Sequence, residues 1–246
     1  MRFSRNPVAG TTGPLTWFSF SRERPYHQFL NASRAIILAL QELRFIFMNR
    51  MPSKLSPTRP TICVFCGSSH GADPVYTETA RAFGTGMVEA GFDLVFGGGG
   101  VGLMGETALA VSKAGGKILG IIPSFLRHLE PPLTVSQEIV ITDSMNERKA
   151  RMFAAADGFA VLPGGLGTLD EFAEAFTGAQ LRLHAKPIVL VNVKNYYAPL
   201  MALIDHFVAE GFAGAHVKNL IHLAPTVEDA IAIFAAHQAG KVKAAE

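Results

Sequence analysis

Residues 158–171 read GFAVLPGGLGTLDE, an apolar run followed by a glycine-rich turn and two carboxylates. The run GFAVL has the unbroken apolar character of a strand that is covered on both faces of a parallel sheet. Gly164, Gly165 and Gly167 then let the backbone turn tightly and bring its N–H groups close to a ligand. A helix is predicted for residues 169–181. The stretch therefore predicts a strand, a tight turn and a helix in succession.

The same unit recurs from Thr61 onward. Short apolar runs alternate with helical stretches, which predicts a parallel sheet with helices on both faces, the doubly wound class of α/β fold. The predicted strands are TICVFCG (61–67), FDLVFGG (92–98), KILGIIP (117–123), EIVIT (138–142), GFAVLPGG (158–165), KPIVLVNV (186–193) and LIHLA (220–224), and the predicted helices lie at 74–90, 106–115, 145–156, 169–181, 197–210 and 227–236.

Composition limits the classes of partner. The 246 residues are 49% hydrophobic and 17% charged, with a net charge of +2 and no long basic block, so nothing favours nucleic acid. The longest apolar run, residues 35–47, is interrupted by Gln41, Glu42 and Arg44 and is shorter than the roughly 20 residues that a membrane span needs. We expect neither a nucleic-acid nor a membrane partner.

Residues 1–58 differ from the rest of the chain, since they hold seven arginines and only two acidic residues. This composition fits a transit peptide, an over-extended start before Met48 or Met51, or a disordered or partly helical leader without chemistry. PSKLSPTRP joins this leader to the globular part. We predict a leader at 1–58, one nucleotide-hydrolase domain at 59–240 and a frayed tail at 241–246.

The only cysteines, Cys63 and Cys66, are spaced as C-x-x-C. That spacing can make a redox pair, but positions three apart on a strand point to opposite faces, which makes a disulfide awkward. No Cys/His cluster with zinc spacing accompanies the two cysteines. We predict buried, unpaired thiols in a reducing cytoplasm, and neither a metal nor a cofactor.

Three glycine-rich segments each follow a predicted strand: CGSSHG (66–71), GGGGVGLMG (97–105) and PGGLGTLDE (163–171). The carboxyl ends of parallel strands meet at one edge of the sheet, where such folds bind ligands. Three segments that converge there are a stronger indication of a site than any one of them.

The first two segments each allow two interpretations. Gly100, Gly102 and Gly105 match a dinucleotide fingerprint, but no acid follows at the end of KILGIIP to hold a ribose. The loop is then a phosphate or ribose cradle, with Gly98, Gly99 and Gly105 near the ligand, or it serves tight packing of strand on helix. Ser68 and Ser69 of CGSS likewise offer hydroxyls and amides to a ligand, or Ser69 or Asp73 only caps the helix that begins at Pro74.

In PGGLGTLDE the glycines predict an anion-binding turn, and Thr168 could cap the next helix. Asp170 and Glu171 would lie in the first turn of that helix, where acids are common because the helix dipole stabilises them. A carboxylate beside an anion cradle is electrostatically unusual, however. The conflict favours an acid that faces another part of the ligand, where positive charge develops.

A basic segment, MNERKARM (145–152), opens the preceding helix. Arg148 and Lys149 lie near its start, where cations oppose the helix dipole, so helix propensity does not explain them. Glu147 and Arg151 form an i,i+4 pair that would give an ordinary solvated face. Arg148 and Lys149 remain candidates to bind a phosphate or a carboxylate.

The pair of motifs Met145-x-x-Arg148-Lys149 and Pro163-Gly-Gly-x-Gly-Thr-x-x-Glu171 resembles the signature of the Lonely Guy (LOG) family, over residues 61–237. These are cytokinin riboside 5′-monophosphate phosphoribohydrolases, with the older label lysine decarboxylase-like. The resemblance implies a Rossmann-like fold, a homodimer, and hydrolysis of N6-substituted AMP, or of AMP as in an AMP nucleosidase. It implies a nucleoside 5′-monophosphate as substrate.

The resemblance also implies residue roles. Arg148 and Glu171 match the catalytic pair of the family. The implied substrate contacts are Lys149, Gly165, Leu166, Gly167, Thr168, Glu130 and Thr177. From the glycine-rich loops we also predict substrate contacts at Gly164, Ser68, Gly98, Gly99 and Gly105. The chain has Asn146 and Gly178 where His and Trp are common, which concerns base specificity and the dimer face.

Other functional classes carry less support. A nucleotide or cofactor carrier on the same fold would not need Glu171. An NAD-dependent oxidoreductase is disfavoured by the missing ribose-binding acid, and a lysine decarboxylase by the lack of a pyridoxal phosphate site beyond a generic phosphate cradle.

Overall fold

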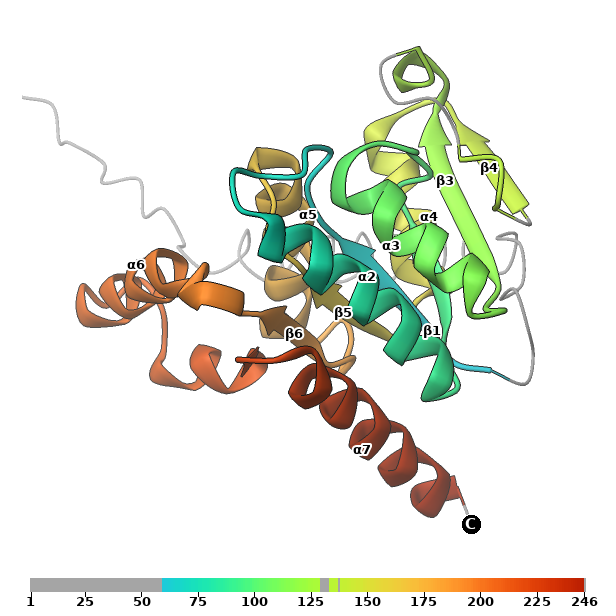
Figure 1. Cartoon of the computed structure of the whole chain (residues 1–246). Coiled ribbons are helices and arrows are strands. Elements are labelled where there is room, and N and C mark those ends of the chain that lie inside the picture. The colour runs from blue at the N-terminus through green and yellow to red at the C-terminus, as the bar shows by residue number, and fades with distance from the viewer. Residues whose placement is uncertain (1–58, 129–132, 137, 246) are drawn as a thin grey trace, which may run out of the picture. The chain divides into compact units, whose positions relative to one another are not determined.

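A computed structural model describes residues 59–128, 133–136 and 138–245, with side chains described up to residue 240 (Figure 1). The predicted leader, residues 1–58, lies outside these residues. Seven parallel strands form one sheet in the order β4-β3-β2-β1-β5-β6-β7, so the predicted Rossmann-like α/β fold is confirmed. The strands are β1 (Thr61–Phe65), β2 (Asp93–Phe96), β3 (Ile118–Pro123), β4 (Glu138–Thr142), β5 (Gly158–Val161), β6 (Ile188–Val191) and β7 (His222–Ala224).

Helices connect the strands and end with α7, which runs through the predicted tail. The α-helices are α2 (Pro74–Glu89), α3 (Gly102–Lys113), α4 (Met145–Ala155), α5 (Leu166–Gln180), α6 (Ala198–Ala209) and α7 (Val227–Ala245), and the short 3-10 helices are η1 (Ser124–Leu126), η2 (Val193–Asn195) and η3 (Ala215–Leu220). Within the described part of the chain, no helix is both long and apolar enough to cross a membrane.

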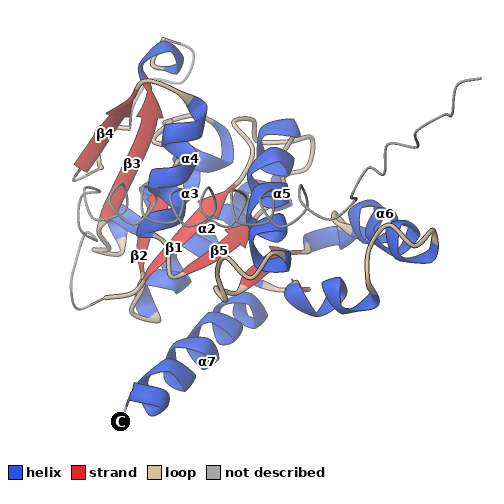
Figure 2. Cartoon of the chain, turned by 180° about the vertical axis from the view of Figure 1, so that it is seen from behind, coloured by secondary structure: helices blue, strands red, loops and turns tan. Residues whose placement is uncertain are grey.

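The two faces of the sheet are covered by different helices, as Figures 1 and 2 show from opposite sides. Successive side chains of a strand point to opposite faces. Ile62 and Val64 of β1 therefore pack with α2, α3 and α7, whereas Cys63 and Phe65 pack with α4, α5 and α6. Burial on both faces explains why the strands are apolar throughout, and each fully buried aliphatic side chain contributes roughly 1.5–3 kcal/mol.

The alternation of side chains also explains why the two cysteines do not form a disulfide. Cys63 and Cys66 are both buried and unpaired, and they belong to the clusters on opposite faces of the sheet. Burial raises the pKa of both thiols. The prediction of unpaired packing cysteines is confirmed.

Helix α2 is fixed at both ends by side chains. Oδ1 of Asp73 accepts a hydrogen bond from the Val75 N–H at 2.9 Å, so Asp73 is the N-cap and Pro74 follows at the first helical position. At the other end, the Arg59 guanidinium donates to the carbonyls of Val88 and Gly91 at 2.8 and 3.2 Å. The predicted alternative that Asp73 caps this helix is therefore confirmed.

Candidate active site

The glycine loops after β1, β2 and β5 meet at one edge of the sheet. These three strands are neighbours, and the strand order reverses between β1 and β5, which is where folds of this class bind ligands. The Gly67 N–H donates to the Pro163 carbonyl at 3.0 Å, and the Leu103 N–H donates to the Gly67 carbonyl at 3.0 Å. The predicted convergence of the three loops is confirmed.

The N–H groups at the start of α3 are already engaged by the loop that follows β1. The N–H groups of Leu103 and Met104 both point to the Gly67 carbonyl, at 3.0 and 3.4 Å, so they are not free for a phosphate. A Cβ on Gly105 would overlap with the Gly100 carbonyl, and a Cβ on Gly102 with the backbone of the first loop. These contacts support tight packing as the reason for the fingerprint-like glycines.

Gly98 and Gly99 are buried, and Gly98 has a φ of 79° that favours glycine. The Gly98 carbonyl accepts from the Leu133 N–H at 3.1 Å. Ser68 is exposed beside the start of α3. Substrate contacts at Ser68, Gly98, Gly99 and Gly105 stay predictions.

Helix α5 begins at Leu166, three residues earlier than predicted, with Gly165 as its N-cap and no capping side chain. Thr168 is the third helical residue, is 5% exposed, and packs against Gly164. The prediction that Thr168 caps this helix was wrong. Glycine is a poor helix former, but at the second helical position Gly167 is in a turn whose N–H groups have no intrahelical partner in any case.

In the turn before α5, each carbonyl group of residues 162–164 accepts a hydrogen bond. The Leu162 carbonyl accepts from the Tyr197 hydroxyl at 2.6 Å, the Pro163 carbonyl from the Gly67 N–H at 3.0 Å, and the Gly164 carbonyl from the Tyr196 hydroxyl at 2.7 Å. Residues 165–167, in contrast, are exposed at the start of the helix. An approaching anion therefore meets N–H groups and the positive end of the helix dipole, which is the environment that anions prefer.

Glu171 lies in the second turn of α5 and not in the first turn, which holds no acid. The first-turn placement of Asp170 and Glu171 was wrong because the helix starts earlier, so dipole stabilisation does not account for them. Glu171 is 9% exposed. Its charge acts on β1, since after burial it is the next cause that raises the pKa of Cys63 and Cys66. Its carboxylate is thus within electrostatic reach of Cys66, which follows β1 at the edge where the loops converge.

Arg148 of α4 is 5% exposed and reaches the end of β2. Its Nη2 donates to the Gly97 carbonyl at 3.1 Å, and a Cβ on Gly97 would overlap with the guanidinium. Within the described residues, its Nε has no hydrogen-bond partner. The Arg148 charge also acts on Cys63, in the direction opposite to Glu171. A buried guanidinium with a spare donor fits a ligand acceptor.

Lys149 joins α4 to α5. Its Nζ lies 2.9 Å from Oδ2 of Asp170 and 2.8 Å from Oε2 of Glu174. Burial lowers the pKa of Lys149, but hydrogen bonds to Glu174 and Asp170 outweigh burial and raise it. This ion-pair cluster links α4 to α5, the two helices that carry the predicted catalytic side chains Arg148 and Glu171.

The predicted surface pair on α4 is also present. Arg151 Nη2 lies 2.9 Å from Oε1 of Glu147, and both side chains are partly exposed. Arg148 and Lys149, in contrast, are buried. The structure thus separates an ordinary solvated pair from a buried Arg148 that binds the Gly97 carbonyl and a buried Lys149 that binds carboxylates of α5.

Two further predicted contacts are Thr177 and Glu130. Thr177 is exposed on α5, about 9 Å along the helix axis from Glu171 at 1.5 Å per residue. Glu130 lies outside the described residues. Both stay predictions, as do the roles of Gly164 and Leu166 in binding.

The sequence did not predict the contacts made by four residues of the candidate site: Gly97, Asp170, Glu174 and Tyr196. The i,i+4 spacing of Asp170 and Glu174 was a usable signal, since it puts both acids on one face of a helix. Gly97 and Tyr196 act through contacts 51 and 32 residues away in sequence, and nothing local indicates them.

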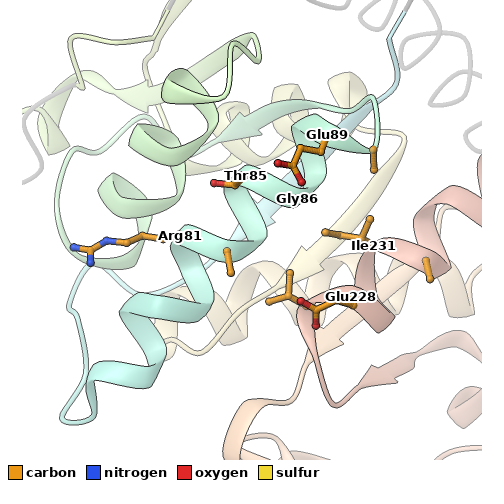
Figure 3. A pocket seen from close by; sticks show the side chains of 10 residues that line it. Arg81, Thr85, Gly86, Glu89, Glu228 and Ile231 are labelled. Carbon is orange, nitrogen blue, oxygen red and sulfur yellow. The ribbon is translucent and has the colours of Figure 1, made fainter.

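A cavity of about 660 Å³ lies elsewhere, between α2 and α7 (Figure 3). Arg81, Gly86, Glu89, Glu228 and Ile231 are among the residues that line it. It includes no residue of the three glycine loops or of α4 and α5, so it is separate from the candidate site. No group of three or more His, Cys, Asp or Glu that could hold a metal ion occurs in the described ranges.

Comparisons with known proteins agree with this arrangement. The family model described as possible lysine decarboxylase matches residues 104–234. A probable cytokinin riboside 5′-monophosphate phosphoribohydrolase of Oryza sativa subsp. japonica is 44% identical over 170 residues, which is 69% of this chain and 70% of that protein. The chain belongs to the Lonely Guy (LOG) family. Another Lonely Guy relative, a cytokinin riboside 5′-monophosphate phosphoribohydrolase of Arabidopsis thaliana, is 45% identical over 69% of this chain and 78% of its own length.

Solved structures share the fold of this Lonely Guy protein. The molybdenum cofactor binding protein of Rippkaea orientalis superposes with a TM-score of 0.57 at 25% identity, over 74% of this chain and 98% of that one. The Moco carrier protein of Chlamydomonas reinhardtii gives a TM-score of 0.57 at 21% identity, over 74% of this chain and 99% of its own.

Proposed function

We propose that this chain hydrolyses the N-glycosidic bond of adenosine 5′-monophosphate, with or without an N6 substituent, to the free base and ribose 5-phosphate. Its relatives are named cytokinin riboside 5′-monophosphate phosphoribohydrolases. The observation that supports the proposal is a pair of buried, charged side chains near the converging loops: Arg148, which binds the Gly97 carbonyl, and Glu171, whose charge acts on Cys66.

The phosphate of the substrate would bind at residues 165–168. Tyrosine hydroxyls bind the carbonyls of Leu162 and Gly164 just before this turn, and the exposed start of α5 offers N–H groups and a positive dipole. Arg148 adds a delocalised cation whose Nε has no hydrogen-bond partner in the described residues. A bound nucleotide would thus have its negative end at the helix start and its sugar toward Glu171.

The Glu171 carboxylate would act at C1′ of the ribose, the carbon at which the bond to the base breaks. As the bond between C1′ and the base nitrogen breaks, the electron pair leaves with the base and the ribose ring gains positive charge. A carboxylate close to C1′ stabilises that charge and takes a proton from the attacking water, whose oxygen forms the new bond to C1′. The departing base gains a proton, so the products are the neutral base and ribose 5-phosphate.

The proposed assembly is a homodimer. Helix α5 and the segment after it expose Leu166, Leu169 and Leu181 at 85%, 44% and 62%. Exposed leucines along one helix are apolar surface that a partner could cover, and this helix carries Glu171. Light scattering should give twice the mass of one chain, and Leu169→Lys should shift the protein toward the monomer.

We also propose a cytoplasmic location, which suits two unpaired buried cysteines.

A second candidate is a carrier that binds a nucleotide or a cofactor without turnover. The structural likeness to a molybdenum cofactor binding protein at 25% identity favours it. A carrier does not need a buried carboxylate next to its anion site, which favours the hydrolase.

One experiment separates the two. The full chain is incubated with AMP and, in parallel, with isopentenyladenosine monophosphate, and the free base is measured by chromatography. Release of either base supports hydrolysis, and the ratio of the two rates identifies an AMP nucleosidase or a cytokinin-specific enzyme. Tight nucleotide binding without any release of base would favour the carrier.

A further inference from the structure

The loop between β6 and α6, residues 192–197, reaches across to the anion-binding turn. It carries Tyr196 and Tyr197, whose hydroxyls donate to the carbonyls of Gly164 and Leu162 at 2.7 and 2.6 Å. Two adjacent side chains of one loop thus hold two of the three carbonyls that precede α5. The geometry of the turn depends on this loop.

The loop itself is held in an unusual conformation. Lys194 and Asn195 have φ angles of 51° and 59°, a region that residues other than glycine rarely adopt. Asn192 braces it, since its Nδ2 donates to Oδ1 of Asn195 at 3.0 Å and its Oδ1 accepts from the Tyr197 N–H at 2.8 Å. Such conformations persist where the surrounding contacts over-determine them, and they cluster at ligand-binding sites.

Contacts on the other side tie the loop to the β1–α2 connection. Lys194 Nζ pairs with Oδ2 of Asp73 at 2.5 Å, and Asp73 caps α2. The rings of Tyr196 and Tyr76 meet edge to face with their centroids 5.6 Å apart. The loop therefore links two of the ligand-binding connections, after β1 and after β5.

The two tyrosines differ in what they can do. Tyr197 is 7% exposed and belongs to a core cluster, so its hydroxyl serves the stability of the sheet. Tyr196 is 37% exposed and bonds to Gly164, the residue just before the N-cap of α5. Only the Tyr196 contact lies directly behind the exposed N–H groups of the turn.

We propose that Tyr196 is a positioning residue of the phosphate subsite, which holds the Gly164 carbonyl away from the ligand so that the first-turn N–H groups of α5 face the anion. The proposal rests on the proposed function for the nature of the ligand. A carbonyl released from Tyr196 can rotate toward the bound phosphate and repel it. The hydroxyl thus contributes to binding without touching substrate.

The test compares Tyr196→Phe with Tyr76→Phe, which removes a hydroxyl from the neighbouring ring and keeps the aromatic contact. Steady-state hydrolysis of AMP gives KM and kcat, and calorimetric titration with ribose 5-phosphate gives a binding constant that does not depend on turnover. Loss of one neutral hydrogen bond predicts a roughly two- to tenfold rise in both KM and the ribose 5-phosphate Kd for Tyr196→Phe. We expect kcat within twofold of the wild type and no change for Tyr76→Phe.

An unchanged Kd for ribose 5-phosphate in Tyr196→Phe would overturn the proposal, as would a fall in kcat at constant KM. An equal rise in Tyr76→Phe would show a general effect of loop packing and would also overturn it. If the wild type binds ribose 5-phosphate but releases no base, the proposed hydrolysis fails while the Kd comparison still decides the role of Tyr196. A wild type that binds no ribose 5-phosphate overturns the proposal for Tyr196, whereas the release of base still decides the proposed hydrolysis.

Discussion

Replacement of Gly97 by alanine tests whether the buried guanidinium of Arg148 works from its observed position. A Cβ at Gly97 would lie 3.0 Å from Cζ and 3.5 Å from Nε of Arg148, and closer still to Nη2. The backbone of Gly97 has an ordinary φ, so alanine fits the main chain there and the clash is with the guanidinium alone. The methyl group should therefore push Arg148 off the Gly97 carbonyl.

The size of the effect follows from the contact that is lost. Nη2 of Arg148 donates to the Gly97 carbonyl at 3.1 Å in a buried environment. A hydrogen bond from a charged donor contributes about 1.5–3 kcal/mol, and each 1.36 kcal/mol is a factor of ten in rate. We expect Gly97→Ala to lower kcat/KM roughly tenfold to 150-fold.

The assay is release of free base from AMP, with Gly240→Ala as the matched control because a Cβ at Gly240 meets nothing within 4 Å. In an Arg148→Ala background, Gly97→Ala should have little further effect, since both changes remove the same interaction. A Gly97→Ala enzyme within twofold of the wild type would refute the reasoning. So would a full additional loss in the Arg148→Ala background.

Three further predictions follow from the same contacts. Arg148→Lys should lower kcat/KM roughly tenfold or more in steady-state assays, because an ammonium cannot reproduce the planar fork of donors. Lys149→Met should lower the free energy of unfolding by only about 1 kcal/mol in urea titrations, since both partner carboxylates are about half exposed; it should also reduce activity, because α4 and α5 lose their link. Burial raises the pKa of Cys63 and Cys66, so a thiol reagent at pH 8 should modify them only after unfolding. The folded chain keeps thiol protons that the unfolded chain releases above about pH 8.5, so the free energy of unfolding should fall between about pH 9 and 11.

The sequence was sufficient to predict the sheet and the convergence of the three glycine loops. Strands buried on both faces show as apolar runs, and the carboxyl ends of parallel strands necessarily share an edge, so the convergence of the three glycine loops could be predicted. Arg148 and Lys149 could also be singled out, since cations at a helix start have no local explanation, but their burial was not predicted.

Neither the first residue of α5 nor the long-range contacts of the candidate site could be predicted from the sequence. Local propensity predicted a helix from Leu169, whereas tertiary contacts to the carbonyls of residues 162–164 allow it to begin at Leu166. Two contacts join segments that are far apart in the chain: Arg148 with the Gly97 carbonyl, and Tyr196 with the Gly164 carbonyl. Such contacts leave no periodic or local pattern in the sequence.

The most direct test of the central claim is Glu171→Gln, which keeps the shape of the side chain and removes its charge. Base release from AMP and ribose 5-phosphate binding are measured on the same preparation. If the carboxylate stabilises the developing charge on the ribose and takes the proton from water, turnover should fall at least about a thousandfold while ribose 5-phosphate binding stays within a few-fold of the wild type. A Glu171→Gln protein that releases base at near wild-type rates would contradict the assignment.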